Sequence, residues 1–299
     1  MKQRIITGFF LGVVLIPLIY LGGWFMYGLS IVLSYVATFE LVKMYTEKKN
    51  LSNHFKFVIP LFSVLLVALA GLIFRCPDLF DITDIVFSLI VTFALLLIGS
   101  LFNGQLKTSD VMMFFGFILY GGLGIFMAFS ARNIEVLRGV KIDNLGLLLF
   151  CYVILTTIFT DMGAYTFGLL FGKTKLCPTI SPKKTVEGAI GGSFTGALVG
   201  SLVLIIGERL MEFNLFGLEH EMLNIVTIAT FSLIITIVAQ LGDLVASKLK
   251  REYGIKDYGF IFPGHGGVMD RFDSLIMTGT FFFVLLSMFG VVLWETYVS

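Results

Sequence analysis

The stretch LNIVTIATFSLIITIVAQL, residues 223–241, contains no charged side chain and no proline. A bilayer hydrocarbon core about 30 Å thick needs roughly 20 apolar residues to be crossed by one α-helix. The run does not alternate strictly between apolar and polar residues. Since the strands of a membrane barrel do alternate, this stretch predicts a transmembrane helix.

Eight further stretches of similar character occupy much of the remaining chain. Together with 223–241 they predict an all-α, polytopic integral membrane protein with about nine transmembrane helices. We interpret the first stretch as a helix and not as a cleaved signal peptide, because no A-x-A-like cleavage site follows it. The eight stretches are 5–21, 23–42, 57–74, 82–102, 111–129, 145–160, 189–206 and 274–294.

The composition fits a protein whose main solvent is lipid. Hydrophobic residues make up 57% of the 299-residue chain, charged residues make up 14%, and the mean hydropathy is +0.96. A soluble domain has about 45–50% apolar and about 25% charged residues. These values exclude a soluble enzyme, a disordered chain and a secreted disulfide scaffold. The near balance of 21 basic and 20 acidic residues argues against a nucleic-acid partner held by bulk charge.

Basic residues are shared unequally between the two sides of the membrane that nine helices would create. One side carries about twice as many lysines and arginines as the other, so the positive-inside rule places it in the cytoplasm and the N-terminus outside. Two polar segments, 161–188 and 242–273, fall on this cytoplasmic side. We therefore divide the chain into an N-terminal transmembrane region, 1–142, with about five helices, and a C-terminal catalytic region, 143–299, with these two loops.

Four polar residues follow the run 223–241 at helical spacing. If the helix continues past Leu241, then Asp243, Ser247, Lys250 and Arg251 share one face. An ionisable residue at the membrane boundary is a candidate site because its burial is costly without a partner. The alternative is an ordinary interfacial helix end, with the two basic side chains reaching to the headgroups.

A glycine-rich turn lies further along the same segment, at residues 263–267, and reads PGHGG. Such a turn brings backbone N–H groups close to an anion. Three charged residues, Asp270, Arg271 and Asp273, follow it at the expected start of the last helix. Carboxylates beside basic groups suit a nucleoside triphosphate, since Mg²⁺ takes one or two carboxylates plus phosphate oxygens. His265 is read as a hydrogen-bonded spacer more readily than as a catalyst, and no ligand cluster for zinc surrounds it.

The other polar segment offers a second set of charges. Asp161 ends the run 145–160 and is expected on the same side of the membrane as Asp243. Thr185 could cap the helix that follows, whose N-terminus favours an anion. The alternative is a basic segment that only follows the positive-inside rule or attracts anionic headgroups. The candidate phosphate-binding residues here are Ser181, Lys183 and Lys184.

The polar residues of the C-terminal segment form one long pattern: Ser247-x-x-Lys250-Arg251, then Lys256-Asp257, then Pro263-x-His265-Gly266-Gly267-x-x-Asp270-Arg271-x-Asp273. This pattern resembles the signature of the phosphatidate cytidylyltransferases, membrane enzymes that make CDP-diacylglycerol. The segments 161–165 (DMGAY) and 180–188 (ISPKKTVEG) are similar to a second stretch of that family. The resemblance covers roughly the last 140 residues.

The resemblance implies a transferase of phospholipid biosynthesis that joins CTP to phosphatidic acid and releases pyrophosphate. It implies Mg²⁺ (or Mn²⁺), with Asp243 and Asp270 as the first choice of ligands and Asp273 and Asp161 in reserve. A further monovalent cation and a homodimer are also compatible with it. The residues expected at the triphosphate or the lipid phosphate are Ser181, Lys183, Lys184, Ser247, Lys250, Arg251, Lys256, His265, Gly266, Gly267 and Arg271.

Two other functions are also compatible with the sequence. A related enzyme could transfer a group from CTP to another membrane lipid, or act as a polyprenol kinase, and a kinase would release CDP in place of pyrophosphate. An ion-coupled transporter would also contain many helices with acidic residues. Acids spread through the membrane depth would favour transport, whereas here they cluster near one side beside lysines and glycine turns.

Overall fold

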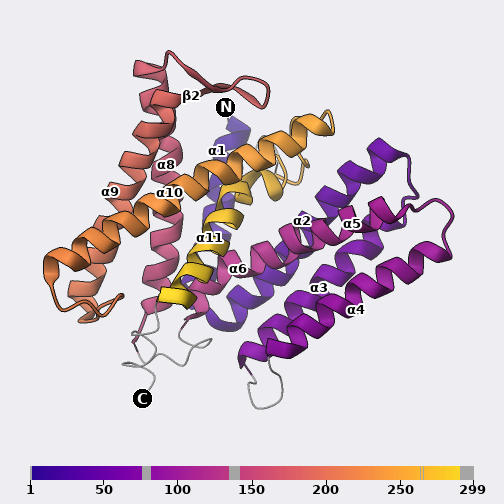
Figure 1. Ribbon diagram of the computed structural model, residues 1–299, viewed down its shortest axis with the longest axis horizontal. Coiled ribbons are helices and arrows are strands. Elements are labelled where there is room, and N and C mark those ends of the chain that lie inside the picture. Colours follow the sequence, from indigo (N-terminus) through magenta and orange to yellow (C-terminus); the bar gives the residue numbers. More distant parts are fainter. Residues whose placement is uncertain (1, 76–81, 135–141, 263, 265, 290–299) are drawn as a thin grey trace. The chain divides into compact units, whose positions relative to one another are not determined.

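The computed structural model describes residues 2–75, 82–134, 142–262, 264 and 266–289. These residues form helices almost throughout, with one short β-hairpin (Figure 1). Seven of the described helical segments are long and apolar enough to cross a membrane, so the chain is a multi-pass integral membrane protein. The predicted helical class is confirmed, and the count of nine is not. Cys76, Pro263 and His265 lie outside the described residues.

The chain forms two compact units, which we describe separately. The first contains residues 1–126 together with 253–272, and the second contains residues 127–252 together with 273–299. The units therefore differ from the predicted division at residue 142. The segment 253–272, which carries the glycine-rich turn, belongs with the N-terminal helices.

The first unit is built mainly from five helical segments. The first four are α1 to α4, and the fifth consists of α5 and α6 joined by an irregular turn. Residues Ile118–Leu123 form a π-helical turn between α5 and α6. Gly121 in this turn lies against α2, where an added Cβ would be 3.1 Å from the Thr38 nitrogen. The elements are α1 (Lys2–Leu21), α2 (Gly23–Lys49), α3 (Phe55–Arg75), α4 (Ile82–Leu101), α5 (Thr108–Phe117) and α6 (Gly124–Ser130), which continues into the second unit.

The second unit contains three long helices and the hairpin. Helices α8 (Leu145–Phe171) and α9 (Val186–Met211) lie side by side, and α10 (Glu221–Glu252) packs against both (Figure 1). Strands β1 (Lys175–Cys177) and β2 (Ser181–Thr185) pair antiparallel, and β2 leads directly into α9. Most of the last helix, α11 (Met269–Phe289), also belongs to this unit.

Small residues allow α8 and α9 to approach closely. An added Cβ at Gly192 would be 2.7 Å from the carbonyl oxygen of Thr160 and 2.8 Å from the Cβ of Ala164. Close backbone approach through small residues is a common way to pack helices in lipid. Gly168 on α8 likewise lies against Thr185 and Gly188, so small residues make this contact along the end of α8.

The two predicted loops, 161–188 and 242–273, are shorter than expected. Helix α8 continues ten residues beyond Asp161, because the apolar residues of 162–171 extend the run after this single acid. Helix α10 likewise continues past Leu241 to Glu252, which meets the condition for the shared face of its polar residues. The connections are therefore 172–185, mostly hairpin, and 253–268. Asp161 lies within α8 and not at its end.

Candidate active site

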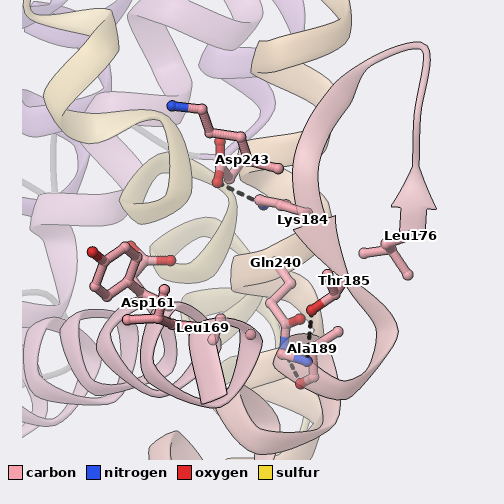
Figure 2. A pocket seen from close by; sticks show the side chains of 13 residues that line it. Asp161, Leu169, Leu176, Lys184, Thr185, Ala189, Gln240 and Asp243 are labelled. Atoms are coloured by element: carbon pink, nitrogen blue, oxygen red, sulfur yellow. Dashed lines mark hydrogen bonds and ion pairs between the residues drawn. The ribbon is translucent and has the colours of Figure 1, made fainter. Parts of the chain in front are cut away.

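A pocket with a volume of about 410 Å³ lies in the second unit, lined by α8, the hairpin, α9 and α10 (Figure 2). Its wall combines charged groups with apolar side chains. This combination suits a ligand that carries both phosphate and hydrocarbon. The residues with polar or large apolar side chains that line it are Asp161, Tyr165, Leu169, Leu176, Lys183, Lys184, Thr185, Gln240 and Asp243.

An ion pair between Lys184 and Asp243 lies in this pocket (Figure 2). The Lys184 Nζ is 2.6 Å from Asp243 Oδ2, and the two side chains are 27% and 28% exposed. The Ser247 hydroxyl donates to Asp243 Oδ1 at 3.3 Å. Both oxygens of Asp243 therefore have partners, while enough of the pair is exposed for a ligand to reach it. The predicted shared face of Asp243 and Ser247 is confirmed.

The hairpin and the cap of α9 fix the position of Lys184. Thr185 is the N-cap residue of α9, and its side chain accepts a hydrogen bond from the Gly188 N–H at 3.1 Å, as predicted. On α10, the Gln240 side chain donates to the Ala189 carbonyl at 3.2 Å and to the Ser193 hydroxyl at 2.8 Å. These contacts tie the start of α9 to the α10 segment that carries Asp243.

The other predicted residues of α10 have different partners. Lys250 Nζ is 3.9 Å from Asp273 Oδ2, and both side chains are largely buried. Arg251 is exposed, and its Nε donates to the Ile180 carbonyl in the hairpin turn at 3.4 Å. The common face of α10 thus contacts both α11 and the hairpin.

In the first unit, the described residues of the glycine-rich turn lie against carboxylates of the chain itself. Asp270 Oδ2 accepts hydrogen bonds from the N–H groups of Tyr258 at 2.8 Å and Gly267 at 3.0 Å. Gly266 has φ +84°, a conformation that favours glycine, and an added Cβ would be 2.8 Å from Asp270 Oδ2. The N–H of Gly267 is therefore directed at Asp270 and not outward toward a phosphate.

Sequence reasoning gave no role to Glu40, which the structure places in this same turn. Its Oε1 accepts from the Val268 N–H at 3.0 Å and its Oε2 from the Met269 N–H at 2.9 Å. The side chain comes from α2 and is 1% exposed. The available signal was an acid inside the apolar run 23–42, because a buried ionisable residue in a membrane helix marks a site by default.

The remaining predicted residues occupy varied positions. Lys183 is exposed and lines the pocket, and Ser181 is half-buried at the start of β2. Lys256 and Arg271 are exposed in the first unit. His265 lies outside the described residues.

The carboxylates fit Mg²⁺ only in combination with a ligand. Among the described residues no group of three His, Cys, Asp or Glu side chains could hold a metal ion by itself. Asp161 and Asp243 both line the pocket, and Mg²⁺ in nucleotide sites takes one or two carboxylates plus phosphate oxygens. The Lys184 ammonium already occupies the cationic position beside Asp243. The other first-choice ligand, Asp270, belongs to the first unit.

Comparison with known proteins relates the whole chain to one group of enzymes. The model of the cytidylyltransferase family matches residues 2–289. The chain belongs to the cytidylyltransferase family. Proteins named phosphatidate cytidylyltransferase are 32% identical to it in Bacillus subtilis (97% of this chain and 99% of the relative) and in Staphylococcus haemolyticus (92% and 95%). The relative of that name in Staphylococcus aureus is 31% identical over 92% of this chain and 95% of its own length.

Membership of the cytidylyltransferase family makes the chain a nucleotidyltransferase. It agrees with the resemblance drawn from the C-terminal pattern and extends it to the N-terminal helices, which the match also covers. A nucleotidyltransferase must bind a triphosphate, and the pocket of the second unit is lined by two lysines and two carboxylates.

Proposed function

We propose that this protein transfers the cytidylyl group of CTP to phosphatidic acid, giving CDP-diacylglycerol and pyrophosphate. The proposal rests mainly on the likeness to phosphatidate cytidylyltransferases over nearly the whole chain. The pocket around Lys184 and Asp243 supports it, because it joins phosphate-binding charges to an apolar wall. Phosphatidic acid carries a phosphate and hydrocarbon chains, so it needs both kinds of contact.

In the proposed reaction, a phosphate oxygen of phosphatidic acid attacks the α-phosphorus of CTP. A new P–O bond forms, the bond from the α-phosphorus to the bridging oxygen breaks, and the β- and γ-phosphates leave as pyrophosphate. The nucleophile is already an anion, so the reaction needs no strong general base. The protein then acts by positioning its two substrates and neutralising their charge.

The residues of the pocket and the end of α10 have separate tasks in this proposal. Lys184 and Lys183 bind the lipid phosphate, and Leu169 and Tyr165 contact the adjoining hydrocarbon. Asp243 holds Lys184 in place before the substrates arrive. Lys250 and Arg251, from the end of α10, neutralise charge on the triphosphate.

Mg²⁺ (or Mn²⁺) is the proposed cofactor. In the second unit, Asp243 and Asp161 line the pocket and would hold it together with phosphate oxygens. Asp270 and Asp273 are candidate ligands through the family resemblance alone. When bound, the metal ion would neutralise phosphate charge and orient the α-phosphorus. Asp243 Oδ2 now pairs with the Lys184 ammonium, so the same carboxylate would serve both the ion and this lysine. A monovalent cation could assist at the same carboxylates.

We further propose that the pocket opens on the cytoplasmic side, in the plasma membrane of a bacterial cell. The excess of basic residues on the predicted cytoplasmic side supports this orientation. The relatives in Staphylococcus haemolyticus and Bacillus subtilis are bacterial. CTP and membrane lipid would then reach the pocket from different directions. A homodimer is part of the proposal through the family resemblance alone.

The test is an assay of the purified full chain in detergent with labelled CTP and phosphatidic acid, with and without Mg²⁺. Formation of CDP-diacylglycerol and pyrophosphate in equal amounts, dependent on Mg²⁺, supports the proposal. Release of CDP would identify a lipid kinase. If a folded sample consumes no CTP with any lipid phosphate or alcohol, the proposal fails and transport becomes the leading function.

A further inference from the structure

Glu40 is a buried acid on α2 that lies outside the C-terminal pattern. Its two oxygens accept hydrogen bonds from the consecutive N–H groups of Val268 and Met269. Helix α11 begins at Met269, so these donors are among those that a helix start leaves without intrahelical partners. A carboxylate there is stabilised by hydrogen bonding and by the helix dipole.

The turn is shaped to admit this side chain. An added Cβ at Gly259 or at Gly267 would collide with Glu40 Oε1, so the chain passes close to the carboxylate on two sides. Gly267 also donates its N–H to Asp270, which in turn accepts from Tyr258. The turn is therefore built around two carboxylates, one from α2 and one from α11.

Helix α2 also contacts the beginning of the same segment. The Tyr45 ring lies 5.8 Å from the ring of Tyr253, between centroids, at the residue that follows α10. The Tyr45 hydroxyl donates to Asp110 Oδ1, a buried carboxylate on α5, which fixes the ring. One helix of the N-terminal region thus holds both ends of the segment 253–269.

We propose that Glu40 is a positioning residue for cytidylyl transfer. It acts through the turn and the start of α11, and holds Asp270 and the backbone of Gly266 and Gly267 in a single arrangement. This inference rests on the proposed function and assigns a task to the N-terminal helices, which the C-terminal pattern leaves without one. Groups that orient metal ligands from outside the coordination shell contribute about 10- to 100-fold to metal affinity or activity, and Asp270 is a candidate ligand in the proposed function.

The decisive variant is Glu40→Gln, which keeps the shape of the side chain but places an amide N–H₂ against a backbone donor. Glu208→Gln is the matched control: Glu208 is 8% exposed and accepts from the Leu215 N–H and the Asn224 amide, each at 2.7 Å, in a different loop. Glu40→Asp is the conservative variant, which keeps the charge. All are made in the full chain and purified in detergent.

Two measurements are compared: hydrogen–deuterium exchange of residues 258–270, and kcat and KM for phosphatidic acid. We expect Glu40→Gln to exchange faster in this segment alone and to lose about 10- to 100-fold in kcat, with KM within about twofold. Glu208→Gln should match the wild type in both measurements, and Glu40→Asp should recover part of both losses. If Glu40→Gln does not fold, Gly259→Ala tests the same contact from the other side.

Unchanged exchange in residues 258–270 would overturn the proposal, and so would faster exchange with normal kcat. Faster exchange throughout the helices would also overturn it, because the effect would then be on global stability. If the wild type itself makes no CDP-diacylglycerol, the proposed function fails and the catalytic part of this inference fails with it. The exchange measurement still decides whether Glu40 orders the turn.

Discussion

At the scale of single residues, the pocket depends most on Asp243, which pairs with Lys184 and accepts from Ser247. Asp243→Asn removes the charge with little change in shape, so we expect a loss of about 100-fold or more in kcat/KM. Folding and membrane insertion should be unchanged. The control is Glu252→Gln, on the same helix, which removes an exposed ion pair with Lys248 at 3.7 Å. Near-normal turnover by Asp243→Asn would remove this carboxylate from the site.

Asp270 and His265 allow a second comparison within the glycine-rich turn. Asp270→Asn can keep one acceptor for the Tyr258 and Gly267 N–H groups but loses the charge, so we expect about 100-fold lower activity. His265→Ala should lose less than about tenfold if its ring is only a spacer. Steady-state assays of both variants give the ranking, and an equal or larger loss for His265→Ala would make the ring a catalytic group.

At the scale of elements, the contact between α8 and α9 makes a prediction about stability. Gly192→Ala would place a Cβ 2.7 Å from the Thr160 carbonyl oxygen, so it should destabilise the protein by about 1–3 kcal/mol. Gly28→Ala, on α2, is the control, because no atom lies within 4 Å of the added Cβ and alanine favours a helix. In the same detergent, the thermal midpoint of Gly192→Ala should be lower than that of the wild type. The midpoint of Gly28→Ala should be equal to it or higher. A midpoint for Gly192→Ala at or above that of the wild type would contradict this packing.

Some features of these helices follow from the sequence, and others do not. Apolar length predicted the helices, and helical spacing placed Asp243 and Ser247 on one face only on condition that the helix continued past Leu241, as α10 does. The prediction that Asp161 ends its helix is wrong. Apolar residues resume after this single acid, so the helix continues to Phe171. The partners of Glu40 are 228 and 229 residues away in the sequence, a separation that no local pattern encodes.

At the scale of the whole molecule, function depends on which side of the membrane each connection faces. The connections before and after α9 carry different charges. The hairpin connection before it has Lys173, Lys183 and Lys184. The connection from α9 to α10 has Glu212 and Glu219. Basic residues remain in the cytoplasm during insertion, while acidic residues contribute little to orientation. Under the proposed function, the pocket beside the hairpin takes CTP, a highly charged, water-soluble substrate, so we expect that side to face the cytoplasm.

Cysteine labelling tests this orientation on the full chain. Cys76, Cys151 and Cys177 are first replaced, and then Lys173→Cys or Glu219→Cys, both at exposed positions, is introduced alone. In intact bacterial cells a membrane-impermeant maleimide should label Glu219→Cys at once and Lys173→Cys only after permeabilisation. The two positions flank α9, whose 26 residues span about 39 Å and so cross a whole bilayer core. The reverse pattern would place the pocket outside, where no CTP is available, and would contradict both the orientation and the proposed reaction.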